Sequence, residues 1–337
     1  MEERFLFTTP DSEPDAQAQS DLESSPLVQP EPYSQTSRQT EVYRLPDQWP
    51  LLAPPQPNRV TGKQALRHLL WGIATVLTTV LAGTLLFGTL KSGVMYSLTI
   101  LTILTAHEFG HYIACRWYGV EATLPYFIPF VIPFSGTLQA GTFGAFIKIK
   151  SPIPSRRALF DIGIAGPLAG FVFAIPATFI AHYFAQPSPF VEGDSFIQLQ
   201  DPLLFTFFQR AMQLPKDLLL NPVMWAAWIG LLMTALNLMP VGQLDGGHVT
   251  YALFGRRGHR AVAAACYVGV IALVGYSIYN QSWSYILYAV ILTLMMRGGH
   301  PPVVDEEGSL GTPRVLVALI GLLIFALCFM PFPVKIN

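Results

Sequence analysis

The sequence predicts an all-α polytopic membrane protein with about seven transmembrane helices and a short membrane-associated β element between the second and third. Composition is the first observation, because 52% of the 337 residues are hydrophobic and only 12% are charged, whereas soluble domains carry roughly 25% charged residues. The second observation is a series of apolar stretches near the roughly 20 residues that a helix needs to cross a bilayer. The third is the placement of basic residues at alternate ends of these stretches.

The first 60 residues differ from the rest of the chain. They hold ten acidic and four basic residues, are rich in Pro, Ser and Gln, and show no apolar periodicity. Such a composition cannot bury enough apolar surface to fold. We therefore expect residues 1–60 to form a disordered acidic cytosolic tail, followed by a membrane domain over 61–337. The chain has no general excess of basic residues, so no nucleic-acid partner is expected.

The apolar stretches define seven candidate spans. They are 66–90, 93–115, 158–185, 221–240, 261–279, 282–297 and 313–332. Basic residues in loops mark the cytosolic side of a membrane protein. With a cytosolic N-terminus, one set of basic residues falls on that side: Lys63, Arg67, Arg116, Lys148, Lys150, Arg156, Arg157, Arg256, Arg257, Arg260 and Arg297. The connection 186–220 then lies outside, where apolar residues at helical spacing over 203–212 predict an amphipathic surface helix.

The second span contains His107-Glu108-Phe109-Gly110-His111. Ionisable groups inside a membrane are costly, and so are candidates for function. Histidines four residues apart on a helix share one face and can hold one Zn²⁺, with Glu108 beside them to take a proton from water. The alternative is a packed pair of histidines that share hydrogen bonds. His107 lies about 13 Å inside the boundary that Arg116 marks, so hydrolysis there would require a path for water.

A second irregular segment, 237–248, lies near the cytosolic end of the fourth span and reads Asn-Leu-Met-Pro-Val-Gly-Gln-Leu-Asp-Gly-Gly-His. Pro240 and Gly242 interrupt a helix. Two histidines leave a catalytic zinc site one protein ligand short, and Asp245 is an acid at the same edge as His111. Asp245 could instead cap a helix N-terminus.

Together, H-E-F-G-H and the downstream N-x-M-P-x-x-x-L-D-G-G resemble the site-2 protease family of intramembrane zinc metalloproteases. The resemblance covers a core of about 93–255. It implies one Zn²⁺ held by His107, His111 and Asp245, with Glu108 as the catalytic general base. It also implies that Asn237 binds the substrate or the developing oxyanion, although an interhelical hydrogen bond is an equal alternative for this side chain.

Three other features complete the expectations. Prolines over 123–152 exclude a continuous helix, and 143–150 has strand-like character. An edge strand there could hold an opened substrate by β-augmentation, or could be purely structural. The Gly166–Gly170 pair predicts close helix packing, and Asp161 is expected in the first turn of its helix, where it would complement the helix dipole.

The resemblance implies an enzyme of 61–337 that cleaves transmembrane segments of other membrane proteins near the cytosolic side. Its partners would be those substrates and the lipid bilayer, in a bacterial inner membrane or an organelle membrane. Two alternatives are a membrane zinc transporter and a catalytically silent homologue that binds substrates without cleavage. A transporter requires polar residues along several spans, whereas here they gather at one edge.

Overall fold

The computed structural model describes residues 61–130, 139–188, 197–279, 293, 303–305, 308–331 and 333–336. These residues belong to one compact unit, Pro54–Asn337. The predicted tail, 1–60, lies outside the described residues, and so does the predicted sixth span, 282–297, except for Thr293.

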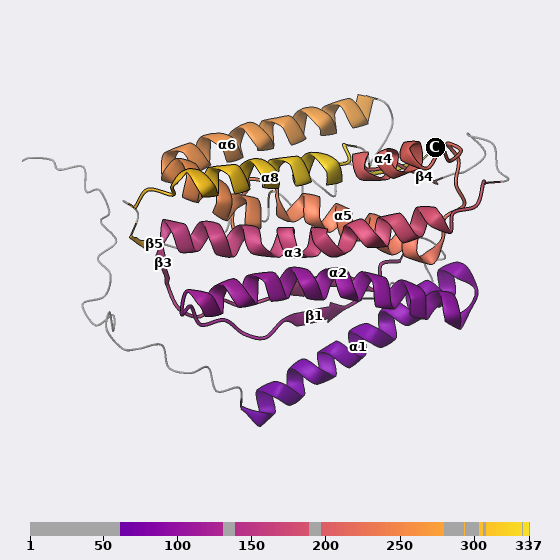
Figure 1. Ribbon diagram of the computed structural model, residues 1–337, viewed down its shortest axis with the longest axis horizontal. Helices are drawn as coiled ribbons and strands as arrows, with labels where there is room; N and C mark the ends of the chain where they lie inside the picture. The colour runs from indigo at the N-terminus through magenta and orange to yellow at the C-terminus, as the bar shows by residue number, and fades with distance from the viewer. Residues whose placement is uncertain are drawn as a thin grey trace, which may run out of the picture. The chain divides into compact units, whose positions relative to one another are not determined.

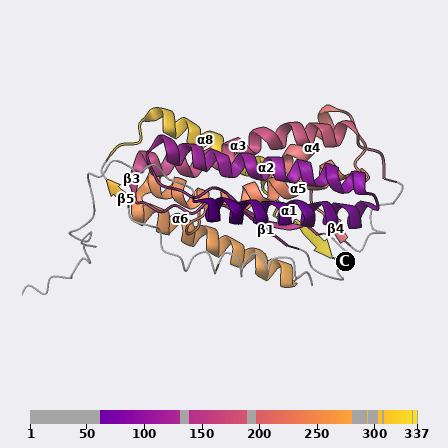
Figure 2. The same cartoon turned by 90° about the horizontal axis from the view of Figure 1, so that it is seen from below.

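Long helices lying side by side make up most of this unit (Figures 1 and 2). They are α1 (Gly62–Phe87), α2 (Leu90–Trp117), α3 (Arg156–Tyr183), α5 (Pro222–Asn237), α6 (Asp245–Tyr279) and α8 (Thr312–Cys328). By length and composition, α1, α3 and α6 can cross a membrane, and α5 and α8 are shorter apolar helices. The prediction of a mainly helical membrane protein is confirmed at this level. The count of seven spans stays a prediction.

Local sequence signals set the helix ends. Thr61 and Gln64 form a reciprocal capping box at the start of α1, which satisfies two backbone N–H groups that the first turn leaves free. Gly88 ends the same helix in the left-handed conformation, with φ of 77°, where glycine carries no Cβ penalty. Thr89 then caps α2 through the Ser92 N–H. The first two helices are therefore joined by a tight turn.

Between the helices, the described residues include three two-stranded sheets. Strand β1 (Tyr126–Pro129) pairs antiparallel with β2 (Thr142–Phe146), in the stretch where prolines exclude a continuous helix. Strand β3 (Ile153–Ser155) pairs parallel with β5 (Val303–Asp305), and β4 (Ile197–Leu199) pairs antiparallel with β6 (Val334–Ile336). The strand-like stretch predicted at 143–150 contains β2, which ends at Phe146, and then an isolated antiparallel bridge between Ile149 and Ala122. Its association with a membrane stays a prediction.

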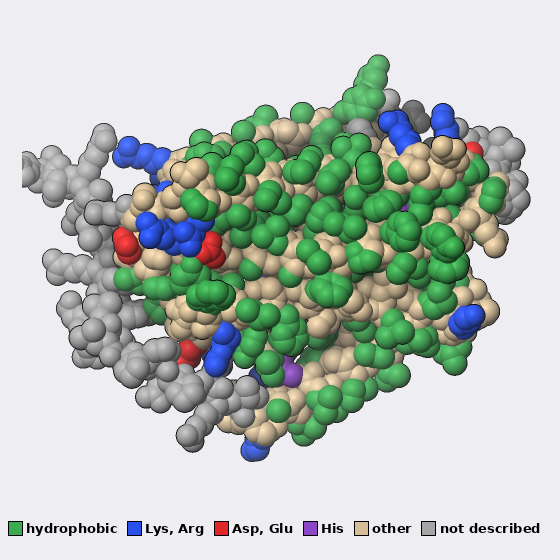
Figure 3. All heavy atoms as spheres, in the orientation of Figure 1, with side chains coloured by type: hydrophobic (Ala, Val, Ile, Leu, Met, Phe, Trp, Pro, Cys, Tyr) green, Lys and Arg blue, Asp and Glu red, His purple; other side chains and the backbone are tan. Residues whose placement is uncertain are grey.

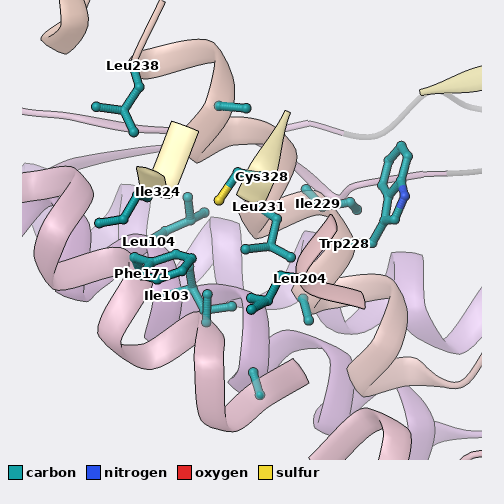
Figure 4. Packing of buried hydrophobic residues seen from close by; sticks show 14 of the residues in the cluster. Ile103, Leu104, Phe171, Leu204, Trp228, Ile229, Leu231, Leu238, Ile324 and Cys328 are labelled. Atoms are coloured by element: carbon teal, nitrogen blue, oxygen red, sulfur yellow. The ribbon is translucent and has the colours of Figure 1, made fainter. Parts of the chain in front are cut away.

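The core forms where α2, α3, α5 and α8 meet (Figure 4). Leu104 of α2, Phe171 of α3, Leu231 of α5 and Ile324 of α8 are buried together in one cluster. On the outside, large apolar side chains of α1, α3 and α8 are exposed, and they cover the middle of the face in Figure 3, while Lys and Arg gather near its two ends. An apolar belt of this extent is unusual on a soluble monomer and suits contact with lipid.

The segment predicted as an amphipathic helix is α4 (Leu203–Ala211). Leu204 and Phe205 are buried, whereas Leu203 and Phe207 are mostly exposed. The helix therefore has one face packed on the protein, against α3 and α8.

The expectation for Asp161 was wrong. Helix α3 begins at Arg156 and has no acid in its first turn. Asp161 lies further along and forms a bidentate ion pair with Arg314 of α8, at 2.9 Å and 2.7 Å. The Tyr118 hydroxyl at the end of α2 donates to the same carboxylate. Burial raises the pKa of Tyr118, and this hydrogen bond raises it further, so the phenol remains a donor. Asp161 therefore joins three helices.

Candidate metal centre

Helix α2 places the predicted histidines on one buried face. The exposed fractions are 5% for His107, 5% for Glu108 and 7% for His111. The Nε2 atoms of the two histidines lie 3.2 Å apart, as expected for side chains one helical turn apart. The four-residue spacing of the two histidines therefore directs one nitrogen of each ring at the same point.

The backbone of α3 fixes the ring of His111. The Nδ1 atom of His111 lies 2.7 Å from the carbonyl oxygen of Ile162. A carbonyl can only accept a hydrogen bond, so Nδ1 carries the proton and donates. In the neutral ring this leaves the lone pair on Nε2, the atom that faces His107 and Asp245.

Asp245 reaches this point from a break between two helices. Helix α5 ends at Asn237 and α6 begins at Asp245. The Asp245 carboxylate places Oδ2 3.2 Å from His107 Nε2 and Oδ1 3.3 Å from His111 Nε2. The structure thus brings the three predicted ligands together from segments that are far apart in the sequence.

Close backbone packing holds this break in place. A Cβ atom on Gly246 would lie 2.0 Å from the Leu238 carbonyl oxygen, and one on Gly247 would lie 2.4 Å from that of Gly242. Gly242 itself has a φ of 54°. The Asp-Gly-Gly sequence therefore permits a backbone approach that side chains would prevent, and this approach places Asp245 beside the histidines.

Two glycines of α3 make room for the histidine rings. A Cβ on Gly166 would lie 2.1 Å from His111 Nε2, and one on Gly170 would lie 3.1 Å from His107 Cβ. The prediction of close helix packing at this pair is confirmed. Sequence reasoning missed that the packing partners are the histidines themselves, although the four-residue spacing shared by the two pairs was a usable signal.

The donor set fits a zinc ion. One possible ligand atom from each of His107, His111 and Asp245 lies within 4.8 Å of the others. A ring nitrogen lone pair and a carboxylate aimed at one buried point repel each other unless a cation lies between them. Two imidazoles and one carboxylate are a known protein ligand set of catalytic zinc. We therefore expect the cluster to bind a metal ion and not to act as a packed histidine pair.

The other two predicted residues also lie at the cluster. Glu108 is buried beside the histidines, and the backbone N–H of Ile147, just after β2, forms a hydrogen bond with its carboxylate. The Asn237 amide nitrogen lies 3.2 Å from His107 Nε2. This contact is the interhelical hydrogen bond that is one of the two alternatives for Asn237. A role for Asn237 in substrate binding stays a prediction.

The arrangement is a buried cluster of two histidines and one aspartate that could hold a metal ion, with a further carboxylate beside it, built between helices. The model of peptidase family M50 matches residues 95–276, which is more than half of the chain. The chain belongs to this family, and the predicted resemblance to site-2 proteases is thereby confirmed.

Curated relatives agree with this assignment. The probable chloroplastic zinc metalloprotease EGY2 of Oryza sativa subsp. indica is 31% identical over an alignment of 257 residues, and the match covers 72% of this chain and 44% of that protein. EGY2 of Arabidopsis thaliana is 28% identical over 72% of this chain and 43% of its own length. EGY1 of the same plant is 28% identical over 69% and 42%. The chain spans less than half the length of these relatives.

Among solved structures, the site-2 protease from Methanocaldococcus jannaschii matches 70% of this chain and 93% of that chain, at 16% identity. The TM-score of this match is 0.35.

Proposed function

We propose that the protein is a zinc-dependent intramembrane endopeptidase that cleaves transmembrane segments of membrane proteins near the cytosolic side. The observation that carries this proposal is the convergence of His107, His111 and Asp245 on one buried point with Glu108 beside it. Membership of peptidase family M50 supports the reaction class, and the relatives named as zinc metalloproteases support the metal.

The roles of the residues follow from their positions. A zinc ion at this centre would act as a Lewis acid that polarises the scissile carbonyl and lowers the pKa of water. His111, held by the Ile162 carbonyl, presents Nε2, and His107 and Asp245 complete the protein ligands. Glu108 takes a proton from the attacking water and delivers it to the leaving amine. Asn237 has an amide N–H to offer the developing oxyanion.

Strand β2 is the proposed substrate platform. A transmembrane helix hides its peptide bonds, so a substrate must be extended before hydrolysis, and an edge strand can hold it by backbone hydrogen bonds. Strand β2 pairs with β1 on one side, and the residue after it, Ile147, contacts the proposed base through its N–H. A substrate strand added to β2 would therefore lie close to Glu108.

The proposed topology has a cytosolic N-terminus, an acidic tail over 1–60 and a protease domain over 61–337 with its catalytic core at about 93–255. The predicted locations are a bacterial inner membrane or an organelle membrane. The names of the plant relatives describe them as chloroplastic, which supports an organelle membrane as one of these locations.

Glu108→Gln tests the proposal. The substitution keeps the size of the side chain and removes the base, so cleavage of a membrane-embedded reporter should fall at least about 100-fold while zinc content, measured by elemental analysis, stays near one ion per chain. Glu121→Gln is the matched control, because Glu121 is an acid beyond the end of α2 and lies outside the cluster; it should cleave at the unsubstituted rate. Unchanged cleavage by Glu108→Gln would refute the assignment.

Two further measurements separate the rival functions. A zinc transporter would move zinc across proteoliposomes at a rate that Glu108→Gln does not abolish. A silent homologue would retain the reporter without cutting it in both forms. We expect neither result.

A further inference from the structure

A small pocket of about 200 Å³ lies between the start of α1, the end of α2 and the segments that flank the β1–β2 sheet. Its lining includes Arg67, His68, Tyr126, Lys148 and Lys150. Every charged residue of the lining is basic. Neither the proposed zinc ligands nor Glu108 line it, so the proteolytic reaction does not account for it.

Tyr126 holds two basic residues of the pocket wall, Arg67 and His68, in place. The Arg67 Nη2 atom donates to the Tyr126 hydroxyl at 2.9 Å, and the guanidinium carbon lies 5.7 Å from the ring centroid. On the same side, the ring centroid of His68 lies 3.9 Å from that of Tyr126, and His68 Nδ1 lies 3.3 Å from the Pro125 carbonyl. Arg67 is therefore held at the wall with further N–H donors free for a ligand.

The positive charge of the pocket is not balanced within the described part of the chain. No described carboxylate forms an ion pair with Arg67, Lys148 or Lys150. Three cations around one concavity repel each other, and an anion between them relieves that repulsion. A phosphate group suits this site in particular, because it accepts several charge-assisted hydrogen bonds at once.

The pocket also borders the apolar surface. Leu66, Leu69 and Leu70 flank Arg67 and His68 in the sequence of α1, and each is more than half exposed. A phosphate seated among the basic residues would therefore leave any attached acyl chains beside an apolar helix face. Basic pockets next to membrane helices on the cytosolic side are suited to anionic headgroups in this way.

We propose that this pocket binds a phosphate-bearing anion, with an anionic phospholipid headgroup as its natural source. The ligand would tie the first turns of α1 to the segment after β2. That segment begins with Ile147, whose N–H contacts Glu108. Occupancy of the pocket would then steady the proposed base, a consequence that rests on the proposed function, whereas binding itself does not.

Binding is measured on the full-length Glu108→Gln protein in neutral detergent, so that the result is independent of proteolysis. The probes are short-chain phosphatidylglycerol, short-chain phosphatidylcholine and inorganic phosphate, titrated separately and read by native mass spectrometry. We expect saturable one-to-one binding of phosphatidylglycerol. The double substitution Lys148→Gln/Lys150→Gln should weaken it about 25-fold, at about fivefold for each charge removed.

The matched control removes the same charge elsewhere: Arg256→Gln/Arg257→Gln should leave the affinity within about twofold. Saturation by phosphatidylglycerol alone assigns the lipid headgroup, and saturation by inorganic phosphate as well assigns the phosphate group irrespective of its carrier; both support the pocket. Equal losses in the two double variants would show general surface attraction and overturn the proposal, as would the absence of saturable binding.

Discussion

Two regions supply the candidate metal centre, and they do so by opposite means. At the α2–α3 interface both helices continue without a break, even though α3 contains Pro167 and Pro176. His107 and His111 fit there because α3 has no side chains at Gly166 and Gly170. At the α5–α6 junction the helix stops at Asn237 and the backbone turns back on itself before Asp245. The first region positions its ligands by helical periodicity, and the second by a break in it.

The difference concerns what each region can tolerate. A ring that meets a new Cβ at Gly166 can swing away about its side-chain torsions, so the fold can survive while the ligand is lost. At Gly246 the obstructing atom is a backbone carbonyl, so the chain itself must move. We therefore expect substitutions at the interface to separate metal binding from stability, and substitutions at the junction to affect both.

Gly166→Ala should have the largest effect on the metal. The new Cβ would lie 2.1 Å from His111 Nε2, so the ring must leave the position in which Ile162 holds it. Zinc affinity should fall at least about 100-fold, with a thermal unfolding midpoint close to that of the unsubstituted protein. Gly269→Ala is the control, since a Cβ there meets nothing within 4 Å. Normal zinc content in Gly166→Ala would disprove the spatial argument.

Gly246→Ala tests the junction. The Cβ would lie 2.0 Å from the Leu238 carbonyl oxygen, and separating the two segments should cost about 1–3 kcal/mol of unfolding free energy and displace Asp245. Zinc affinity should fall about 10–100-fold, together with a lower midpoint in a thermal scan. Loss of zinc at an unchanged midpoint would mean that the two regions do not differ as described.

Asp161→Asn should have the smallest effect on the metal. It removes the charge that pairs with Arg314 and accepts from Tyr118, but leaves the ligands in place. Since the ion pair is partly exposed, its loss should lower the unfolding free energy by about 1 kcal/mol. Zinc content should not change, and Asp217→Asn, which removes an exposed carboxylate, is the control. A large loss of zinc would show that this cluster also orients the adjacent Ile162 carbonyl.

Sequence reasoning predicted the parts of the site that depend on local rules. His107, Glu108 and His111 follow from helical spacing, and the break before Asp245 follows from Pro240 and Gly242. Asp161 was misplaced because its partner, Arg314, lies 153 residues away, and no local pattern joins them. The hydrogen bond from the Ile147 backbone N–H to Glu108 could not be predicted either, because almost every residue type has a backbone N–H.

The fold shows the same division. Capping residues such as Thr61 and Gly88 mark the ends of helices. The ends of α1 and α2 accordingly lie within a few residues of the ends of the predicted spans. In the predicted strand-like stretch, regular pairing with β1 ends at Phe146, and pairing resumes at the Ile149–Ala122 bridge. The partner segment sets this irregularity, so local sequence could not predict it.

The two glycines of α3 have a consequence for anyone who wishes to move this chemistry into another protein. Grafting His-Glu-Phe-Gly-His onto a different membrane helix would supply the groups that hold a metal, but the neighbouring helix would still be filled with side chains. A successful graft must therefore also place glycines on the neighbouring helix, at the positions that correspond to Gly166 and Gly170. The candidate site therefore depends on two helices: α2 supplies the histidines, and α3 supplies the glycines that leave room for them.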